Sequence, residues 1–228
     1  MPAGWSYSAA VSAEHRPELL RFLKTLFPVA EERWLVLGYF ASLLTGHRYA
    51  KKFLVLMDKR CGNNGKSSLL ALMELFFGGD GAYSCRSTKF VSASEELKKH
   101  MILDDALLKQ LTGGSGILVS GRRFHSNERY SFLWQAGIVL VFNEGDCPQF
   151  DPADTAFMER MMVAPMRSKF VGRDEFRRLQ VDDEGGMEPW TFEVMYDVNK
   201  KFPLWLSVLA DVLREHRLDP DEFSRLPQ

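Results

Sequence analysis

A strand pattern, a glycine-rich turn and a helix pattern follow one another within residues 51–77, and this succession constrains the fold more than any other feature. KKFLVLMD, at 51–58, is a short apolar run of the kind found in buried parallel strands. SSLLALMELFF, at 67–77, has apolar residues at helical spacing and is followed by Gly78 and Gly79. The turn RCGNNGKSSLL, at 60–70, therefore lies between a strand and a helix.

This turn has the residues of a phosphate-binding loop. Free backbone N–H groups and the helix dipole attract an anion at a helix N-terminus. Gly62 and Gly65 let the backbone curl close to a ligand, Lys66 can reach the β- and γ-phosphates, and Ser67 can ligate Mg²⁺. Arg60 stands where the generic pattern has its first glycine, which leaves Gly62 to provide the tight exit from the strand. The alternative is a chance Gly-Lys-Ser at a helix start, and the strand–loop–helix setting favours the phosphate loop.

The segments around this loop predict an α/β fold with a mostly parallel sheet. Residues 17–44 form a helical pattern that Pro28 interrupts and Gly46 ends. Residues 104–111 predict a short helix with an acidic cap, and GIVLVF at 137–142 predicts a second buried strand that stops at Asn143. Strands that alternate with helices are typical of parallel sheets.

Two further segments complete the expected organisation. SGILVSGRRFHS, at 115–126, predicts a hairpin that turns at Ser120-Gly121. Beyond Phe170 the sequence becomes polar and predicts a mobile connection, and 190–215 predicts a helical tail. We therefore expect three regions: an N-terminal helical subdomain, a core that contains the phosphate loop, and a polar connection with a helical tail, at residues 1–50, 51–172 and 173–228.

Composition excludes several classes of protein. The 29 Lys and Arg residues balance 30 Asp and Glu residues, so any nucleic-acid contact must come from a local patch. The three cysteines form no CxxC pair, which predicts neither a zinc site nor a disulfide framework and indicates a reducing, intracellular compartment. The longest apolar runs are too short to span a bilayer, and the N-terminus has no signal-peptide pattern. We expect a protein that is neither secreted nor embedded in a membrane.

Four motifs, in this order, resemble the superfamily 3 helicase domain of the primase-helicases of poxviruses and other large DNA viruses: VLMDKRCGNNGKSSLL, SASEEL, LLKQLTGGSG and GIVLVFNEGDCPQFDPADTAFMERMMVAPMRSKF. The resemblance covers residues 15–172. It implies an AAA+ type P-loop ATPase core that uses ATP and Mg²⁺, forms hexameric rings and moves along single-stranded DNA. It also implies a primase domain or protein as a partner and, for a viral protein, the cytoplasm or nucleus of the host cell.

The resemblance assigns roles to individual residues. Glu95 and Glu96 match the acidic pair that binds Mg²⁺ and polarises the attacking water. Asn143 matches the sensor asparagine on the γ-phosphate side, and Arg160 matches the arginine that reaches into the neighbouring subunit's ATP site. Phosphoryl transfer to water needs charge neutralisation, a positioned water and an extra cation, which the lysine, the acidic pair and the arginine would supply. The nucleotide-binding loop, of the GxNGKS form, comprises Gly62, Asn63, Asn64, Gly65, Lys66, Ser67 and Ser68.

The same resemblance indicates where DNA would bind. Lys109, followed by LTGG, falls where the family has its intermediate motif. Ring helicases of this family place a basic hairpin in the central channel, which here corresponds to Arg122, Arg123, Phe124 and His125. Basic charge beside an aromatic ring suits single strands, because phosphates meet cations and bases stack on rings. The alternative is a solvated basic turn.

The other assignments also have alternatives. Glu95 and Glu96 could form the charged start of a surface helix, and MILDD, at 101–105, is a rival acidic pair. However, Asp105 precedes Lys109 by only four residues, which leaves no room for the helix expected between them, so this pair is better explained as a helix cap. Asn143 could merely stop a strand, and Arg160 could be a solvated charge at a helix end.

Two departures from the family bear on activity. The first is Arg60, and the second is the span from Lys66 to Glu95, which at 29 residues is short for a helix, a strand and a further connection. They leave open a truncated or decayed copy that binds nucleotide or serves as a scaffold without catalysis. The phosphate loop alone would also allow a small-molecule kinase, although the sequence shows no acceptor pocket and no arginine-rich lid.

Overall fold

The computed structural model describes residues 5–45, 51–58, 62–78, 90–93, 101–113, 117–122, 129–134, 136–181 and 187–218. Its centre is a four-stranded sheet in the order β2-β5-β1-β6, in which every neighbouring pair is parallel. The strands are β1 (Phe53–Asp58), β2 (Phe90–Ala93), β5 (Gly137–Asn143) and β6 (Met161–Met166). The two strands expected from the apolar runs, β1 and β5, are thus confirmed and lie side by side.

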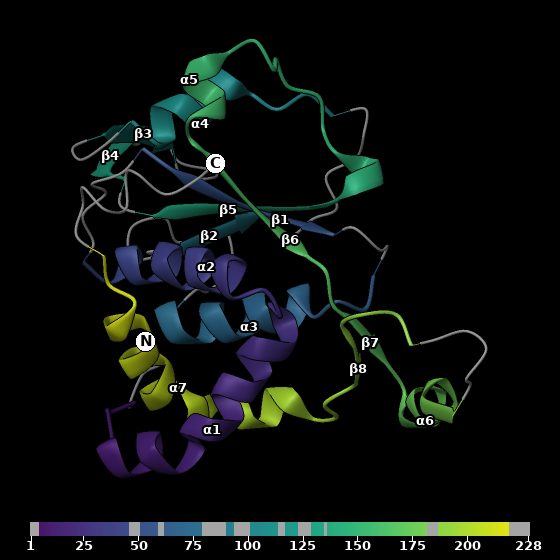
Figure 1. The fold of residues 1–228 in the computed structure, drawn as a ribbon. Coiled ribbons are helices and arrows are strands. Elements are labelled where there is room, and N and C mark those ends of the chain that lie inside the picture. Colours follow the sequence, from purple (N-terminus) through teal and green to yellow (C-terminus); the bar gives the residue numbers. More distant parts are fainter. Residues whose placement is uncertain are drawn as a thin grey trace.

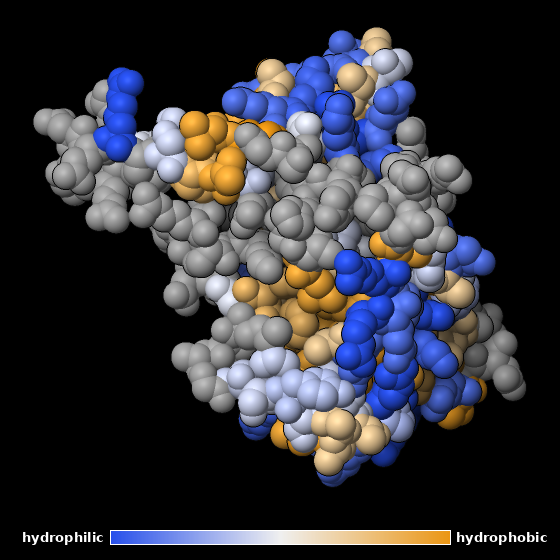
Figure 2. All heavy atoms as spheres, turned by 90° about the vertical axis from the view of Figure 1, so that its left-hand side faces the viewer, coloured by the Kyte–Doolittle hydropathy of each residue, from blue (hydrophilic) through white to orange (hydrophobic). Residues whose placement is uncertain are grey.

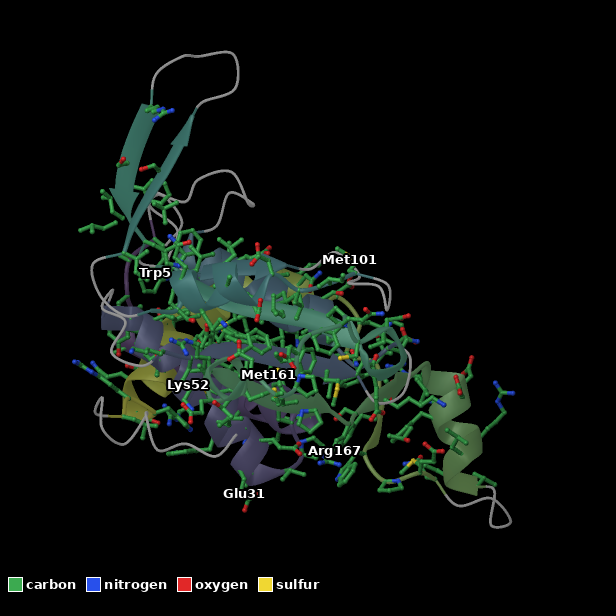
Figure 3. The ribbon with its side chains drawn as sticks, turned by 90° about the horizontal axis from the view of Figure 1, so that it is seen from above. Trp5, Glu31, Lys52, Met101, Met161 and Arg167 are labelled. Atoms are coloured by element: carbon green, nitrogen blue, oxygen red, sulfur yellow. The ribbon has the colours of Figure 1, made fainter. Side chains whose placement is uncertain are left out.

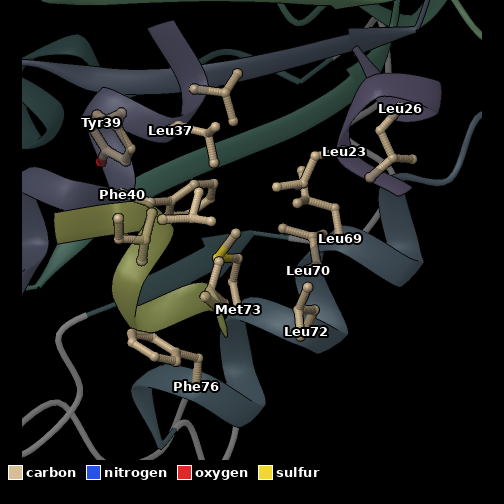
Figure 4. Packing of buried hydrophobic residues seen from close by; sticks show 14 of the residues in the cluster. Leu23, Leu26, Leu37, Tyr39, Phe40, Leu69, Leu70, Leu72, Met73 and Phe76 are labelled. Carbon is tan, nitrogen blue, oxygen red and sulfur yellow. The ribbon is translucent and has the colours of Figure 1, made fainter. Parts of the chain in front are cut away.

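Four helices lie on one side of this sheet in two layers (Figure 1). The layer against the strands contains α2 (Ala30–Ser42) and α3 (Lys66–Phe77), and the outer layer contains α1 (Ala9–Leu26) and α7 (Val198–Glu215). A short 3₁₀ turn, η1 (Leu43–Thr45), follows α2. The break between α1 and α2 falls at Pro28, and α3 ends at Gly78 with a φ of 79°, as expected. Leucine, methionine and aromatic side chains of α1, α2 and α3 meet in the core beneath the sheet (Figure 4).

The first helix begins earlier than the sequence pattern predicted. We expected it to start at Pro17, but α1 runs from Ala9 through this proline. Tertiary contacts explain the difference, because Ser12 Oγ donates to Asp211 Oδ2 of α7 at 2.6 Å and the backbone N–H of Ser8 donates to Ser207 Oγ at 3.1 Å. Packing against α7 therefore outweighs the poor helix propensity of Pro17.

The opposite face of the sheet carries two short helices and a hairpin. The helices are α4 (Asp105–Leu111), which Asp104 caps as expected, and α5 (Thr155–Met158). The hairpin pairs β3 (Leu118–Arg122) with β4 (Arg129–Leu133) in antiparallel fashion. A hairpin is confirmed, but the turn predicted at Ser120-Gly121 is wrong, because both residues lie within β3 and pair with β4. Gly121 therefore occupies a strand position, where glycine is uncommon but permitted.

The chain after β6 adds a small unit beside the end of α1 (Figure 1). It contains β7 (Lys169–Val171) and β8 (Thr191–Glu193), which pair in parallel, and the helix α6 (Arg173–Val181). The segment that we expected as a polar connection thus contains a helix, which Arg173 ties to β8 by an ion pair with Glu193 at 2.8 Å. The helical tail predicted at 190–215 is confirmed only from Val198, where α7 begins, because Thr191–Glu193 pairs with β7 as the strand β8. Within the described ranges, no helix is both long enough and apolar enough to cross a membrane.

Candidate functional site

The glycine-rich loop links the carboxyl end of β1 to α3 and has three residues with positive φ. They are Gly62 at 102°, Asn63 at 50° and Gly65 at 82°. Glycine adopts such angles at little cost, and asparagine tolerates them better than most residues. A Cβ on Gly65 would lie 2.3 Å from Leu26 Cδ2, so this position also excludes a side chain for lack of space. We expected Gly62 to provide the tight exit from the strand, and its positive φ agrees with that role. Arg60 lies outside the described residues.

Lys66 lies at the start of α3, and its ammonium group contacts both strands next to the loop. Its Nζ donates to Asp58 Oδ2 at 2.9 Å and to Asn143 Oδ1 at 3.0 Å. The strand register explains this meeting, because Asp58 and Asn143 are paired at the carboxyl ends of β1 and β5. The structure thus brings together the loop lysine and the asparagine that the sequence analysis singled out.

Further contacts orient the groups around this lysine. Asn143 Nδ2 donates to Asp146 Oδ2 at 3.3 Å, in the 3₁₀ turn η3 (Glu144–Asp146), which directs its carbonyl oxygen toward Lys66. Asn64 is 2% exposed, and its Oδ1 accepts from the backbone N–H of Lys66 at 3.3 Å. Among the residues described, its Nδ2 has no hydrogen-bond partner, so this buried donor is available to a ligand.

Asp58 was not among the residues singled out from the sequence. Its side chain is fully buried, and Oδ2 accepts from the backbone N–H of Gly62 at 2.7 Å as well as from Lys66. An aspartate at the end of an apolar strand gives no specific signal in the sequence, since such residues often simply end strands. Only the fold shows that this carboxylate, at the end of β1, contacts the loop.

A cavity of 710 Å³ opens over the loop, large enough for a nucleotide. Its lining combines the loop, one side of α3 and the end of β5: Gly62, Asn63, Asn64, Gly65, Lys66, Ser67, Ser68, Leu70, Ala71, Glu74, Val141, Phe142 and Asn143. Ser67, the residue that we expected to ligate Mg²⁺, is exposed there. The described residues include no group of three or more His, Cys, Asp or Glu that could hold a metal ion. This donor set still fits Mg²⁺, which often takes only one or two protein ligands and fills its other positions with phosphates and water.

A smaller apolar pocket of 180 Å³ adjoins this cavity and shares Asn63, Gly65 and Ser68 with it. Its remaining walls come from α1, β7, the end of β8 and the start of α7: Phe22, Leu26, Phe170, Val194, Met195 and Val198. The backbone N–H of Phe170 donates to the carbonyl oxygen of Asn63 at 2.7 Å, which fixes β7 against the loop. No pattern in the sequence predicts this pocket, because its walls come from segments that are far apart in the chain and have no shared motif.

Arg160 lies at the amino ends of the strands, opposite the end where Lys66 lies. Its carbonyl oxygen accepts from the N–H of Phe53, the first residue of β1, whereas Lys66 lies beyond the last residue of that strand. Strands rise about 3.3 Å per residue, so the two sites are separated by roughly 17 Å along β1. Figure 3 labels Met161, which follows Arg160, and Arg167, which follows the opposite end of β6. Arg160 does not therefore belong to the cavity of its own chain, and within the described residues its buried Nε has no partner.

Lys109 joins α4 to α5. Its ammonium group pairs with Asp154, and with Asp105 at 3.5 Å. The hydrogen bond to Asp154 raises the pKa of Lys109. The same bond lowers the pKa of Asp154, with a further contribution from the backbone N–H of Phe157. In this structure Lys109 is held within the protein by two carboxylates.

The hairpin stands out from the body of the molecule (Figure 3). It forms the projection at the upper left of Figure 2, where hydrophobic residues are visible. Leu118 and Leu133 are paired at its base and are 60% and 56% exposed. Arg122 and Arg129 are paired at its outer end, which places two basic residues opposite each other. Glu95, Glu96, Arg123, Phe124 and His125 lie outside the described residues.

Comparisons with known proteins establish the fold. No family model and no curated protein match the chain. Among solved structures, the apo A form of the C-terminal region of NrS-1 matches with a TM-score of 0.58 and 13% identity, over 98% of this chain and 52% of that one. A second structure of this region, residues 305–718, also has a TM-score of 0.58 and 13% identity, over 93% and 48% of the two chains.

The chain therefore spans about half the length of the NrS-1 region that it matches. A structure of JCV helicase with a bound small molecule also matches, at 16% identity over 90% of this chain and 61% of that one, but its TM-score of 0.40 is too low to support an argument. The expected fold is confirmed: an α/β P-loop core with a parallel sheet flanked by helices.

Proposed function

We propose that the protein is an ATP-dependent DNA helicase of the superfamily 3 type, which hydrolyses ATP to move along single-stranded DNA in viral DNA replication. The observation that carries this proposal is the 3.0 Å contact between Lys66 Nζ and Asn143 Oδ1, two residues 77 positions apart. They meet at the carboxyl ends of adjacent parallel strands, where α/β folds bind their ligands. This contact would not be expected if Asn143 merely ended a strand or if Lys66 stood at the helix start by chance.

ATP would place its phosphates on the loop and along the N-terminus of α3. Lys66 would neutralise the β- and γ-phosphates, and Asn143 would contact the γ-phosphate from β5. Mg²⁺, when bound by Ser67 and Glu95, would draw charge from the phosphates. The position of β2 supports this role for the acidic pair, because β2 runs parallel to β5 and Glu95 and Glu96 follow its last residue closely in the chain. One of these carboxylates would polarise the attacking water.

The adjoining apolar pocket would hold the base of ATP. It shares three lining residues with the phosphate cavity, so the two cavities adjoin at the loop, and one nucleotide would extend from the first into the second. Its walls include Phe22 and Phe170, and aromatic rings can stack on any nucleotide base. The two cavities together therefore favour a nucleotide over a smaller phosphorylated molecule.

The remaining candidate residues suit an assembly of several copies. Because Arg160 lies far from Lys66 of its own chain, it would complete the ATP site of a neighbouring copy in a ring, most simply a hexamer. The hairpin would then project from each copy, with Arg122, Arg123, Phe124 and His125 gripping one DNA strand. Lys109 would join this contact only after leaving Asp154.

The test is ATP hydrolysis by the purified chain with and without single-stranded DNA, with Lys66→Ala as the control. We expect hydrolysis that DNA stimulates and that the variant lacks. Nucleotide binding without hydrolysis above the variant would favour a non-catalytic nucleotide-binding or scaffold protein, which the Arg60 departure and the short span to Glu95 support. Transfer of phosphate to a nucleoside or nucleotide would instead identify a P-loop kinase.

A further inference from the structure

A single carboxylate oxygen of Asp58 accepts hydrogen bonds from two of the donors that would bind a phosphate. Oδ2 lies 2.9 Å from the ammonium nitrogen of Lys66 and 2.7 Å from the backbone nitrogen of Gly62. The Asp58 side chain is fully buried, and that of Lys66 is only 15% exposed. An anion that belongs to the protein itself is therefore bound inside the candidate phosphate site.

We propose that Asp58 sets the affinity of this site by competing with phosphate for Lys66 and the Gly62 N–H. This inference rests on the proposed nucleotide site and adds a positioning residue to it. The carboxylate holds the lysine and the Gly62 N–H in place. A polyphosphate must take over these donors, or share them with Asp58.

Charge balance in a buried site is the physical reason. Asp58 and Lys66 compensate each other, and a buried ion that loses its partner is strongly destabilising. When a phosphate enters, two kinds of anion surround one lysine, and like charges repel strongly where water is excluded. The negative charge of Asp58 therefore stabilises the empty protein and weakens the binding of anions.

Removing the negative charge with Asp58→Asn should lower the stability of the protein and raise its affinity for anions. The asparagine retains an acceptor oxygen for the Gly62 N–H, and Lys66 retains its contact with Asn143 at 3.0 Å. The lysine nevertheless loses its only described ion-pair partner. Without a ligand the variant is therefore less stable, and its affinity for an anion is higher. A residue that merely shaped the loop would change stability and affinity in the same direction, and both would fall.

The experiment measures binding of tripolyphosphate to the full chain by calorimetry, with EDTA present to exclude metal, together with thermal unfolding. We expect Asp58→Asn to lower the Tm of the empty protein and to tighten tripolyphosphate binding about tenfold, within the usual range of coupling between two charged ligands. The matched control is Asp211→Asn, because that carboxylate is also buried and accepts from Ser12 Oγ at 2.6 Å, but lines neither cavity of the candidate site. We expect it to lower the Tm without tightening tripolyphosphate binding.

The double variant Asp58→Asn with Lys66→Met should lose the gain in affinity for tripolyphosphate, because the lysine mediates this gain. A single variant that folds only when tripolyphosphate is added also supports the proposal, since the added anion then replaces the carboxylate. Unchanged or weaker binding by Asp58→Asn, or failure to fold even with tripolyphosphate, overturns it while leaving the nucleotide site intact. If the wild-type protein binds no tripolyphosphate, the nucleotide site and this proposal both fail.

Discussion

At the residue scale, Asn143 connects the candidate site to the turn that follows β5. Its Oδ1 faces Lys66 at 3.0 Å, and its Nδ2 faces Asp146 at 3.3 Å, so both ends of the amide are used. Lys66 has a second partner in Asp58, so removing the Asn143 side chain leaves the lysine in an ion pair. The amide therefore contributes more to the direction of the lysine than to holding its charge.

We predict that Asn143→Ala lowers kcat for ATP hydrolysis by about 10²-fold, the usual cost of removing one polar group that stabilises a transition state. KM for ATP should change little, because the loop and Lys66 remain in place. Steady-state kinetics of the wild-type and variant proteins measure both constants. A rise in KM at unchanged kcat would instead assign Asn143 to ground-state binding.

Single residues also differ in how well the sequence reveals them. Lys66 could be predicted because its neighbours Gly65 and Ser67 have a fixed spacing that phosphate chemistry requires. Asn143 was found because it matches the sensor asparagine of the helicase family that the four motifs resemble. Asp58 also ends an apolar strand, yet no spacing distinguishes it from an ordinary strand end, and its role depends on β1, the loop and α3 meeting in space.

At the element scale, β7 forms one wall of the site although it lies outside the glycine-rich motif. Phe170 donates its backbone N–H to Asn63 of the loop at 2.7 Å, and its ring lies 6.0 Å from that of Phe192 in β8. A Cβ on Gly65 would lie 3.3 Å from the Phe170 ring, so the loop and β7 are closely packed. The C-terminal unit is therefore part of the candidate nucleotide site.

We predict that Phe170→Leu raises KM for ATP about tenfold, because a leucine keeps the apolar wall but loses the stacking energy between an aromatic ring and a base. Binding of tripolyphosphate, which has no base, should stay the same. Steady-state kinetics measure KM for ATP, and calorimetry measures the binding of tripolyphosphate, for the wild-type and variant proteins. If both ligands bind more weakly, Phe170 acts by supporting the loop, and the base lies elsewhere.

The elements that the sequence predicted well are those with a strong local pattern. The strands at 51–58 and 137–142 and the helix at 67–77 have continuous apolar runs or clear helical spacing, and each is confirmed. The start of α1 and the turn of the hairpin were misplaced because Pro17 and Gly121 were read by their local preferences. Contacts of α1 with α7 and pairing of β3 with β4 decide these positions, and neither is visible from nearby residues.

At the scale of the whole molecule, the first and last described helices, α1 and α7, pack against each other next to the apolar pocket of the site. Trp205 of α7 is fully buried, and its ring lies 5.2 Å from that of Phe22 in α1. Its Nε1 donates to Glu18 Oε2 at 3.1 Å, so the indole meets both apolar and polar partners. Because Phe22 also lines the apolar pocket, this packing reaches the candidate base site.

We predict that Trp205→Ala lowers the free energy of unfolding by about 3–5 kcal/mol, the usual cost of a cavity left by a large aromatic residue. The loss should also raise KM for ATP, because Phe22 loses the ring that holds it against the pocket. Urea denaturation followed by circular dichroism gives the first quantity, and steady-state kinetics well below the denaturation midpoint gives the second.

The matched control is Leu204→Ala, one position earlier on α7, where the side chain is 45% exposed. Substitutions at such surface positions usually change stability by less than about 0.5 kcal/mol. If Trp205→Ala destabilises the protein but leaves KM for ATP unchanged, the joined helices serve stability alone. A rise in KM that only the buried position produces would show that packing between the two ends of the described chain shapes the pocket beside the loop.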